Sequence, residues 1–286
     1  MNQYIRPSIV EQINYKKNLL DRAEHKTKLC KMFRQFEEAA EVEAVRHSLW
    51  IEKQDENPKV HHYNVSKKEN KKAINNNLSA LLWACNNLKP GKLNKEHICM
   101  ISGMIDPEFW NKYAKDAPSN PMYRLIGVRP GGRNGPHTPP YPEKIPGEMN
   151  RYFEELNNLL IEAENERKYG NYNKVLAAAG YSHFHLLRIH PFEDTNGRTS
   201  RILQNSILKY FGFPPATIFG GEKADYIEHI ITAKDGYLTR EGGNSNFKVS
   251  SGEFHFYGYI SNKVNVNLDR ILGKEIIIGN KGFFRF

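Results

Sequence analysis

Apolar residues recur at steps of three and four positions along most of this 286-residue chain, and this spacing constrains the fold more than any other feature. An apolar stripe at that spacing lies on one face of a helix and has to be buried against another element. The stripes predict helices over residues 9–52, 70–88, 93–105, 147–160, 172–189, 202–211, 224–234 and 253–272. We therefore expect a mainly α protein with one large core, or one core with a smaller unit attached.

Residues 121–147 interrupt the helical spacing. Tyr123–Arg129 is typical of a strand, and residues 130–136 collect the proline and glycine of a turn. Residues 138–140 then lead out through two prolines, which are not tolerated in a helix interior. The pattern predicts a small β-hairpin between two helical regions.

The chain has a formal net charge of +9 and a pI near 9.2, a balance that is compatible with binding nucleic acid. The basic residues are nevertheless spread along the sequence, and the one dense run, residues 67–72, is interrupted by Glu69. Such runs are usually solvated surface. No helix-turn-helix or zinc-finger pattern emerges, and ATP or an acidic partner explains a mild basic excess just as well as nucleic acid does.

Cysteine usage and the N-terminal sequence indicate the compartment. Cys30, Cys85 and Cys99 show no metal-ligand spacing and lie in apolar-periodic segments, which is typical of buried reduced thiols. The N-terminal residues lack an apolar targeting segment, and no run of eighteen apolar residues occurs. We expect a soluble, cytoplasmic protein that does not interact with a membrane.

Residues 190–201 carry the local signals of an anion-binding turn. Pro191 disfavours helical backbone at His190, so the preceding helix is expected to end there. Asp194–Gly197 has the composition of a turn, and the next helix is expected to start near Asn196 or Gly197. The unpaired N–H groups and the positive dipole end of that helix favour a phosphate.

The side chains of the same segment meet the needs of phosphoryl or nucleotidyl transfer. Arg198 and Arg201 are three residues apart, lie on one helix face and can each hold phosphate oxygens with two donors. Asp194 offers one hard oxygen to Mg²⁺, and His190 can accept a proton from an attacking hydroxyl. Each feature alone is ordinary, but their conjunction in twelve residues indicates an active site.

Other histidines and aromatic residues are interpreted as structural. His183 and His185 lie on an apolar helix, where a histidine is more often a hydrogen-bonded core residue than a catalytic one. Trp50 and Trp83 are predicted to be core residues. Tyr226 is predicted to pack in the core, with stacking on a nucleotide base as the alternative.

Residues 190–201 resemble the Fic motif, H-x-F-x-[D/E]-G-N-G-R-x-x-R, and match it at every fixed position except one. Thr195 stands where the family has its first glycine. Its N–H still belongs to the phosphate-binding turn, but a β-branched residue resists positive φ. We therefore expect either a slightly different turn or an altered phosphate affinity and register.

The resemblance assigns a role to each motif residue. It implies that His190 deprotonates the target hydroxyl, that Asp194 holds Mg²⁺ and that Arg201 binds the γ-phosphate of ATP. The α- and β-phosphates are expected to be held by the residues of the turn and the first helical turn, namely Thr195, Asn196, Gly197 and Arg198.

The resemblance also implies a fold and a division of the chain. The expected fold is a Fic-type helical bundle with a small β-hairpin flap at 123–140, against which a target protein docks as an added strand. Residues 1–105 are expected to form an N-terminal helical region with an inhibitory helix, 106–272 the Fic core and 273–286 a C-terminal tail.

A second resemblance lies upstream, in His47–Lys53. It is similar to the inhibitory motif of the family, [S/T]-x-x-x-E-[G/N], with Ser48 and Glu52 four residues apart on one helix face and Lys53 in place of glycine or asparagine. The resemblance implies that Glu52 pairs with Arg201 and displaces the γ-phosphate. An exposed helical acid is the ordinary alternative.

Together these resemblances imply a protein adenylyltransferase that moves AMP from Mg·ATP to a serine, threonine or tyrosine hydroxyl and is autoinhibited by Glu52. Three alternatives remain open. One is removal of AMP with Glu52 aligning a water, another is transfer of phosphate, UMP or phosphocholine, and the third is a catalytically weak Fic-fold binding or regulatory module. The sequence leaves the target protein and the oligomeric state, including a homo-oligomer, open.

Overall fold

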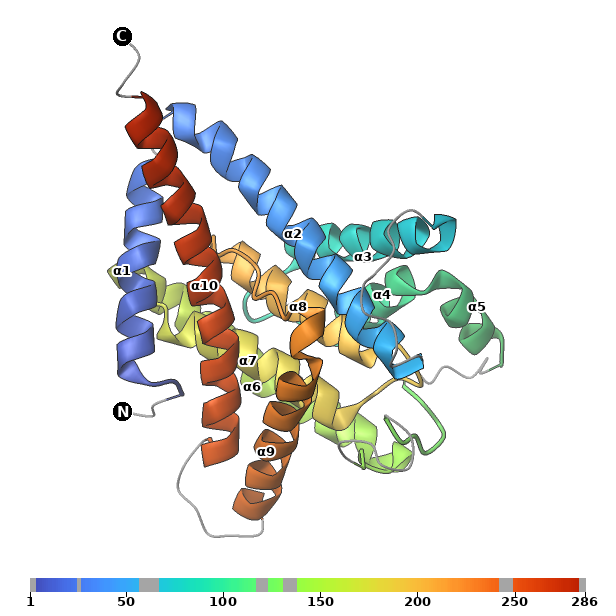
Figure 1. The fold of residues 1–286 in the computed structure, drawn as a ribbon. Coiled ribbons are helices and arrows are strands. Elements are labelled where there is room, and N and C mark those ends of the chain that lie inside the picture. The colour runs from blue at the N-terminus through green and yellow to red at the C-terminus, as the bar shows by residue number, and fades with distance from the viewer. Residues whose placement is uncertain are drawn as a thin grey trace.

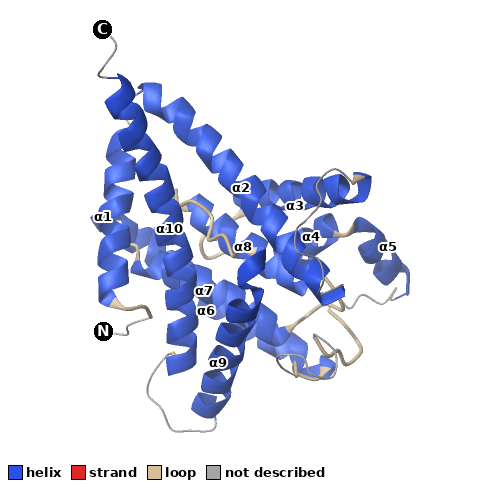
Figure 2. Ribbon diagram, in the orientation of Figure 1, coloured by secondary structure: helices blue, strands red, loops and turns tan. Residues whose placement is uncertain are grey.

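The computed structural model describes residues 4–24, 27–56, 67–116, 123–130, 138–241 and 249–282. Helices make up nearly all regular structure in these residues, and no strand occurs among them (Figure 2). The helices are α1 Pro7–Glu24, α2 Thr27–Glu56, α3 Lys68–Asn87, α4 Lys95–Ile105, α5 Pro107–Asp116, α6 Ile145–Glu166, α7 Asn173–Ile189, α8 Asn196–Tyr210, α9 Lys223–Glu241 and α10 Ser251–Gly282. Three short 3₁₀ turns are η2 Pro142–Lys144, η3 Arg167–Tyr169 and η4 Gly220–Glu222.

Several helix bounds differ from the sequence expectation. The stretch 9–52 contains two helices, α1 and α2, and α10 continues past residue 272 into the segment expected to be a tail. Helix α4 ends at Ile105, as the sequence predicted, but helix α5 was not predicted. Asp106 accepts the Phe109 N–H at 3.0 Å, and proline is favoured in the first turn, so the pair Asp106-Pro107 starts α5.

Helix α7 lies at the centre of the core. From Val175 to Ile189 every residue except Arg188 is buried, which is typical of a helix surrounded by other elements. It packs against α6, α8 and α10, and each large apolar side chain that it buries contributes about 1.5–3 kcal/mol. The residue that follows α7 is therefore fixed in position by a rigid support.

Helix α2 brings the N-terminal region to the centre of the molecule. In Figure 1 it runs diagonally from near the C-terminal end of α10 towards α8, while α1 and α10 lie side by side. α2 contacts α3, α8 and η4. Its C-terminal turns consequently lie beside the N-terminus of α8.

The expected β-hairpin flap is not formed in the described residues. Residues 123–130 and 138–141 form no strand ladder, and the expected turn at 131–137 lies outside the described residues. The Arg124 N–H donates to the Pro191 carbonyl at 2.8 Å, so it bonds to the loop after α7 and not to a partner strand. Pro130, Pro139 and Pro140 have no N–H to donate to a ladder.

Two cysteines can be placed in the core. Cys99 is buried and Cys85 is half-buried, neither is in a disulfide among the described residues, and burial raises the pKa of each thiol to about 12. The side chain of Cys30 lies outside the described residues. Among the helices described, none combines the length and apolar character needed to cross a lipid bilayer.

Candidate active site

His190 is the first residue after α7 and caps that helix in a left-handed conformation. Its φ of 53° and ψ of 60° end the helix, and its N–H donates to the Leu186 carbonyl at 2.9 Å. Pro191 follows and prevents continuation. The Nδ1 atom lies 3.4 Å from the Leu187 carbonyl oxygen, and a proton on Nδ1 leaves a lone pair on Nε2, as a general base requires.

Phe192 and Asn196 close the loop that follows His190. Phe192 is buried, and its ring centroid lies 6.1 Å from that of Trp110 and 6.4 Å from that of Tyr123. The Asn196 side chain accepts the Phe192 N–H at 3.0 Å and donates to the Phe192 carbonyl at 2.8 Å. These bonds bring the N-terminus of α8 back beside His190.

Thr195 adopts the left-handed conformation at the start of α8. Its φ of 69° and ψ of −6° are uncommon for a β-branched residue. Its N–H donates to Asp194 Oδ1 at 2.5 Å, and its hydroxyl donates to the Asp194 carbonyl at 2.6 Å. α8 begins at Asn196, within the range that the sequence predicted.

Arg198 extends from the first turn of α8 towards Asp194. Its Nη2 atom lies 3.2 Å from both carboxylate oxygens of Asp194. Its Nε is buried and has no hydrogen-bond partner among the described residues. Buried donors without a partner are rare in proteins. This Nε–H is therefore a donor from which a phosphate oxygen can accept a hydrogen bond.

Arg201 is almost fully buried and is bound by α2. Its Nε donates to Ser48 Oγ at 2.7 Å, and its Nη2 lies 3.4 Å from the Ser48 carbonyl and forms an ion pair with Glu52. Burial lowers the pKa of Arg201, but Tyr226 and Glu52 raise it by more, so the pKa lies above its usual value. The guanidinium therefore remains charged in the core.

The Glu52 carboxylate lies over the first turn of α8. A Cβ atom on Gly197 would lie 2.6 Å from Glu52 Oε1, so this close approach requires glycine or a shifted carboxylate. A helix N-terminus stabilises negative charge. Glu52 therefore places a carboxylate where the helix end and Arg201 both favour an anion.

The C-terminal turns of α2 are fixed to η4 and α9. A Cβ atom on Gly220 would lie 2.3 Å from the Trp50 ring, so the backbone of η4 packs directly on that side chain. The Gly220 N–H donates to His47 Nδ1 at 3.1 Å, and Lys223 Nζ donates to the Ile51 carbonyl at 2.9 Å. Burial lowers the pKa of His47, which keeps this imidazole a neutral acceptor.

A cavity of about 250 Å³ lies between the C-terminal turn of α2, the loop after α7 and the N-terminus of α8. Its polar lining consists of Glu52, His190, Glu193, Asp194, Asn196, Gly197 and Arg201, and its less polar lining of Ile51, Pro130, Leu187, Tyr226, Ile227 and Ile230. The volume is slightly below the ~300–1,000 Å³ typical of ligand pockets, and Glu52 fills part of it. A polar end beside a helix N-terminus and an apolar end suit a nucleotide.

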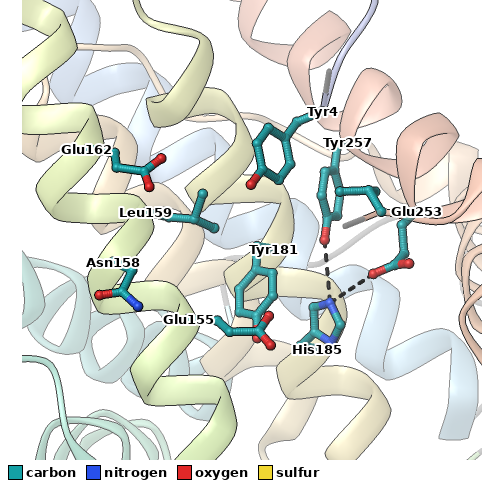
Figure 3. A pocket seen from close by; sticks show the side chains of 10 residues that line it. Tyr4, Glu155, Asn158, Leu159, Glu162, Tyr181, His185, Glu253 and Tyr257 are labelled. Carbon is teal, nitrogen blue, oxygen red and sulfur yellow. Dashed lines mark hydrogen bonds and ion pairs between the residues drawn. The ribbon is translucent and has the colours of Figure 1, made fainter. Parts of the chain in front are cut away.

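A second cavity, of about 340 Å³, lies between α6, α7 and α10 (Figure 3). Its described lining residues include no lysine or arginine. They are Tyr4, Glu155, Asn158, Leu159, Glu162, Tyr181, His185, Val249, Glu253 and Tyr257. No positive side chain among them offsets the three carboxylates, whereas the smaller cavity combines its carboxylates with Arg201 and the N-terminus of α8. Of these two cavities, the smaller is therefore the better suited to a phosphate.

Comparison with known families identifies the domain that contains the smaller cavity. Residues 92–208 match the model of the Fic/DOC family. This chain contains a Fic domain. The matched residues include α4, α6, α7 and α8 and the whole segment from His190 to Arg201.

Curated relatives match over the Fic domain only. The protein adenylyltransferase Fic of Nematostella vectensis is 38% identical over 100 residues, which are 35% of this chain and 21% of the relative. The protein of the same name from Aedes aegypti is 34% identical over 102 residues, which are 36% of this chain and 19% of the relative. The match thus spans about a fifth of the length of these relatives.

Solved structures match over a larger part of the chain. A Fic domain-containing signalling protein from Bacteroides thetaiotaomicron superposes with a TM-score of 0.64 at 15% identity, over 93% of this chain and 98% of that one. Fic-1 of C. elegans superposes with a TM-score of 0.57 at 18% identity, over 93% and 71% of the two chains. At these identities the likeness shows the Fic fold.

Glu193 and Asp194 of the segment 190–201 both line the smaller cavity, and Asp194 stands at the fixed acidic position of the Fic motif. The Asp194 side chain is 53% exposed and lines the smaller cavity. The described residues contain no group of three or more histidine, cysteine, aspartate or glutamate side chains that could hold a metal by themselves. Mg²⁺ often rests on one or two carboxylates with phosphates and water, so Asp194 fits a Mg²⁺ that is bound together with a nucleotide.

Arg124 supports the Fic motif and was missed in the sequence. Its guanidinium is buried and donates to three carbonyls, those of His190 at 2.7 Å, Ile126 at 2.7 Å and Pro140 at 2.6 Å. It therefore joins both ends of the flap region to the backbone of His190. The available signal was an arginine within the strand-like apolar segment 123–128.

Tyr226 and His183 are buried, as the sequence predicted for core residues, and their hydrogen bonds also support the motif. His183 Nδ1 lies 2.5 Å from Gln204 Oε1, and His183 Nε2 lies 2.7 Å from the Tyr226 hydroxyl, which in turn lies 3.4 Å from Arg201 Nη1. Burial lowers the pKa of His183 to about 3, so the ring is neutral. A neutral ring that donates to Gln204 accepts from Tyr226, which leaves the tyrosine oxygen to accept from Arg201.

Proposed function

We propose that this protein transfers AMP from Mg·ATP to a hydroxyl group of a target protein. The observation that carries the proposal is the convergence of His190, Asp194, Arg201 and the N-terminus of α8 on one cavity. The names of the curated relatives support the same reaction. A base, a hard oxygen ligand and an anion site are what nucleotidyl transfer requires.

The proposed reaction is a displacement at the α-phosphorus. His190 Nε2 takes the proton of the target hydroxyl, the hydroxyl oxygen bonds to the α-phosphorus, and the bond from that phosphorus to the β-phosphate oxygen breaks. Pyrophosphate leaves, and AMP remains joined to the protein oxygen. His190 then returns its proton to solvent or to the leaving pyrophosphate.

The other motif residues bind the triphosphate. The N–H groups of Asn196 and Gly197 and the guanidinium of Arg198 hold the α- and β-phosphates, and Arg201 holds the γ-phosphate. Mg²⁺ held by Asp194 would neutralise charge on the phosphates and the leaving pyrophosphate. The apolar side of the cavity, with Leu187, Ile227 and Ile230, binds the adenine ring of ATP.

Glu52 restrains this reaction in our proposal. It already neutralises Arg201, and its carboxylate lies within 2.6 Å of a Cβ built on Gly197. A γ-phosphate that approaches Arg201 meets like charge in a region of low dielectric constant, which costs more than in water. ATP is therefore expected to bind without its γ-phosphate on Arg201, and transfer is expected to be slow.

The target protein is proposed to dock beside residues 123–130. Leu125 and Ile126 are 62% and 56% exposed. The buried Arg124 side chain joins this segment to the His190 carbonyl. Exposed apolar side chains beside the loop that carries His190 can hold a docked peptide. A serine, threonine or tyrosine in such a peptide would lie near the catalytic histidine.

The test is intact-mass analysis of the chain and its Glu52→Gly variant after incubation with Mg·ATP and cell extract proteins. We expect the variant to add AMP, to itself or to a target, at least about tenfold faster than the parent, because removing the carboxylate frees Arg201. His190→Ala in the same background is the matched control and should add none. A mass gain of phosphate, UMP or phosphocholine from the corresponding donor would replace AMP as the group transferred.

Removal of AMP is the second candidate, because Glu52 and His190 line the same cavity and the Glu52 side chain is 28% exposed. A carboxylate in that position can align a water against the phosphate of a modified protein. Glu52→Gly would then abolish AMP release and enhance addition. If folded Glu52→Gly protein neither adds nor releases AMP, the domain is a binding module, and salt-sensitive binding to nucleic acid is then the measurement to make.

A further inference from the structure

Thr195 occupies the position of the first glycine in the Fic motif and adopts the conformation that glycine favours. Its φ is 69°, and its side chain is 1% exposed. Glycine reaches this region at no steric cost, whereas a β-branched residue does not. Some interaction of the threonine side chain must offset that cost for the turn to persist.

Ser102 supplies such an interaction from a different helix. The Ser102 Oγ on α4 lies 2.5 Å from Thr195 Oγ1, and the serine is 1% exposed. The Thr195 hydroxyl has one proton, which is donated to the Asp194 carbonyl at 2.6 Å. Ser102 is therefore the donor and Thr195 the acceptor, and both hydroxyls are paired. Because α4 packs on α8, the serine is held at a fixed place relative to the motif.

The same turn fixes the residue proposed to hold Mg²⁺. Thr195 bonds to Asp194 twice, through its hydroxyl to the backbone carbonyl and through its N–H to Oδ1. Asp194 in turn pairs with Arg198. A shift of Thr195 would move the carboxylate, and with it the first N–H groups of α8.

We propose that Ser102 is a positioning residue for the phosphate-binding turn. Its hydroxyl holds Thr195 in the left-handed conformation and thereby sets the place of Asp194 and of the N-terminus of α8. The pair Ser102–Thr195 substitutes for a glycine in this chain. The inference rests on the proposed nucleotide transfer, because it concerns how Mg·ATP is held.

The test is a double-mutant cycle in the Glu52→Gly background, with Mg·ATP as the probe. Ser102→Ala should raise KM for Mg·ATP about fivefold to tenfold, as expected for loss of one buried hydrogen bond, and should change kcat less than twofold. Thr195→Gly removes the need for the serine. In that background Ser102→Ala should change KM less than twofold, which reveals the coupling of the two side chains.

A purely structural role of Ser102 would give a different pattern. Ser102→Ala would then lower the midpoint of thermal unfolding equally whether position 195 is threonine or glycine. It would leave KM for Mg·ATP unchanged in both proteins. Ser261→Ala is the matched control, since Ser261 is also buried, donates to a carbonyl of its own helix at 2.7 Å and lies on α10. It should not change KM.

A second readout separates this inference from the proposed function. Calorimetric binding of Mg·ADP is measured for the same four variants. If no transfer occurs but Ser102→Ala weakens Mg·ADP binding only with Thr195 present, the positioning role stands and the transfer proposal is wrong. If transfer occurs and Ser102→Ala has the same effect in both backgrounds, or none, the positioning role is wrong. Absence of both transfer and Mg·ADP binding contradicts both.

Discussion

Two histidines five residues apart, one within α7 and one just past its end, have opposite surroundings. His185 lies within α7, is buried, and its Nε2 lies 3.1 Å from Glu253 Oε1 and 3.4 Å from the Tyr257 hydroxyl (Figure 3). His190 lies past the end of α7 and lines the cavity that contains Arg201. The first histidine belongs to a cavity of carboxylates and tyrosines, the second to one with an arginine and a helix N-terminus.

This difference shows what makes a histidine suitable as a base for phosphate chemistry. Burial lowers the pKa of His185, and its ring nitrogen is already engaged by a carboxylate and a tyrosine. Position at a helix end instead exposes the His190 ring to a cavity that can hold an anion. The residue type is the same, and the neighbouring charges determine what each can do.

The largest expected effect separates the two histidines by chemistry. His190→Ala in the Glu52→Gly background should lower the rate of AMP transfer about 10³-fold or more, the usual contribution of a general base together with its positioning. The rate is measured by intact mass, and the unfolding free energy by urea titration should change little. Transfer above a tenth of the background rate would mean that another group acts as the base.

Arg124→Ala tests whether the backbone of His190 must be held. The substitution removes donors from three carbonyls, including that of His190, and a shift of about 1 Å in a catalytic group can cost about 10²-fold in rate. We expect Arg124→Ala to lower kcat about 10²-fold and Arg124→Lys to retain part of the parent kcat. Arg151→Ala, an exposed arginine on α6, is the control and should leave kcat unchanged. Equal kcat in Arg124→Ala would show that α7 alone positions the histidine.

His185→Ala should have the reverse profile to His190→Ala. It removes the hydrogen bond from the neutral His185 ring to the buried Glu253 carboxylate and leaves a cavity, which together cost about 3 kcal/mol of unfolding free energy. Transfer per folded molecule should stay within about threefold, because no reacting atom is near. His255→Ala on the exposed face of α10 is the control for stability. Loss of transfer without loss of stability would place function in the larger cavity.

Acid should lower the unfolding free energy, because His183 and His185 are neutral in the folded core. This is the smallest of the effects that we predict. Burial lowers the pKa of His183 from 6.5 to about 3 and that of His185 in the same direction. These two histidines bind protons near pH 6.5 in the unfolded chain but not in the native chain. The unfolding free energy therefore has its full value above that pH and falls as the pH decreases. His183 contributes a loss that approaches about 1.4 kcal/mol per pH unit between its unfolded and native pKa, and His185 adds a loss in the same direction.

Urea titrations at about pH 7 and pH 5.5 measure this loss before most carboxylates titrate. His183→Gln keeps a polar side chain but cannot take up a proton, so its stability should depend less on pH than that of the parent. Equal slopes in the two proteins would mean that His183 is protonated in the native state.

The local part of the site could be predicted from the sequence. The end of a helix at His190, the turn at Asp194–Gly197 and the start of α8 follow from residues within a few positions of one another. Pro191 and Gly197 act through backbone geometry, which does not depend on the rest of the chain. The helices of the core were predicted for the same reason, since their apolar spacing is local.

Local signals misled where tertiary contacts compete with them. The flap region has the alternation of a strand, but Arg124 bonds to the loop after α7 and leaves no ladder in the described residues. Asp106-Pro107 ends α4 at Ile105, where the sequence predicted the end of a helix, but the same pair also starts α5, which the sequence did not predict.

The sequence by itself determined which chemical groups gather in residues 190–201 and that a helix N-terminus lies among them. The resemblance of His47–Lys53 to the inhibitory motif also implied the pairing of Glu52 with Arg201, 149 positions apart, which the structure contains. Only the tertiary structure decided the other distant contacts, which join positions 93 apart for Ser102 and Thr195 and 66 apart for Arg124 and His190. Side-chain spacing fixes neighbours within an element, whereas contacts between elements arise only when the whole core packs, so no short segment encodes them.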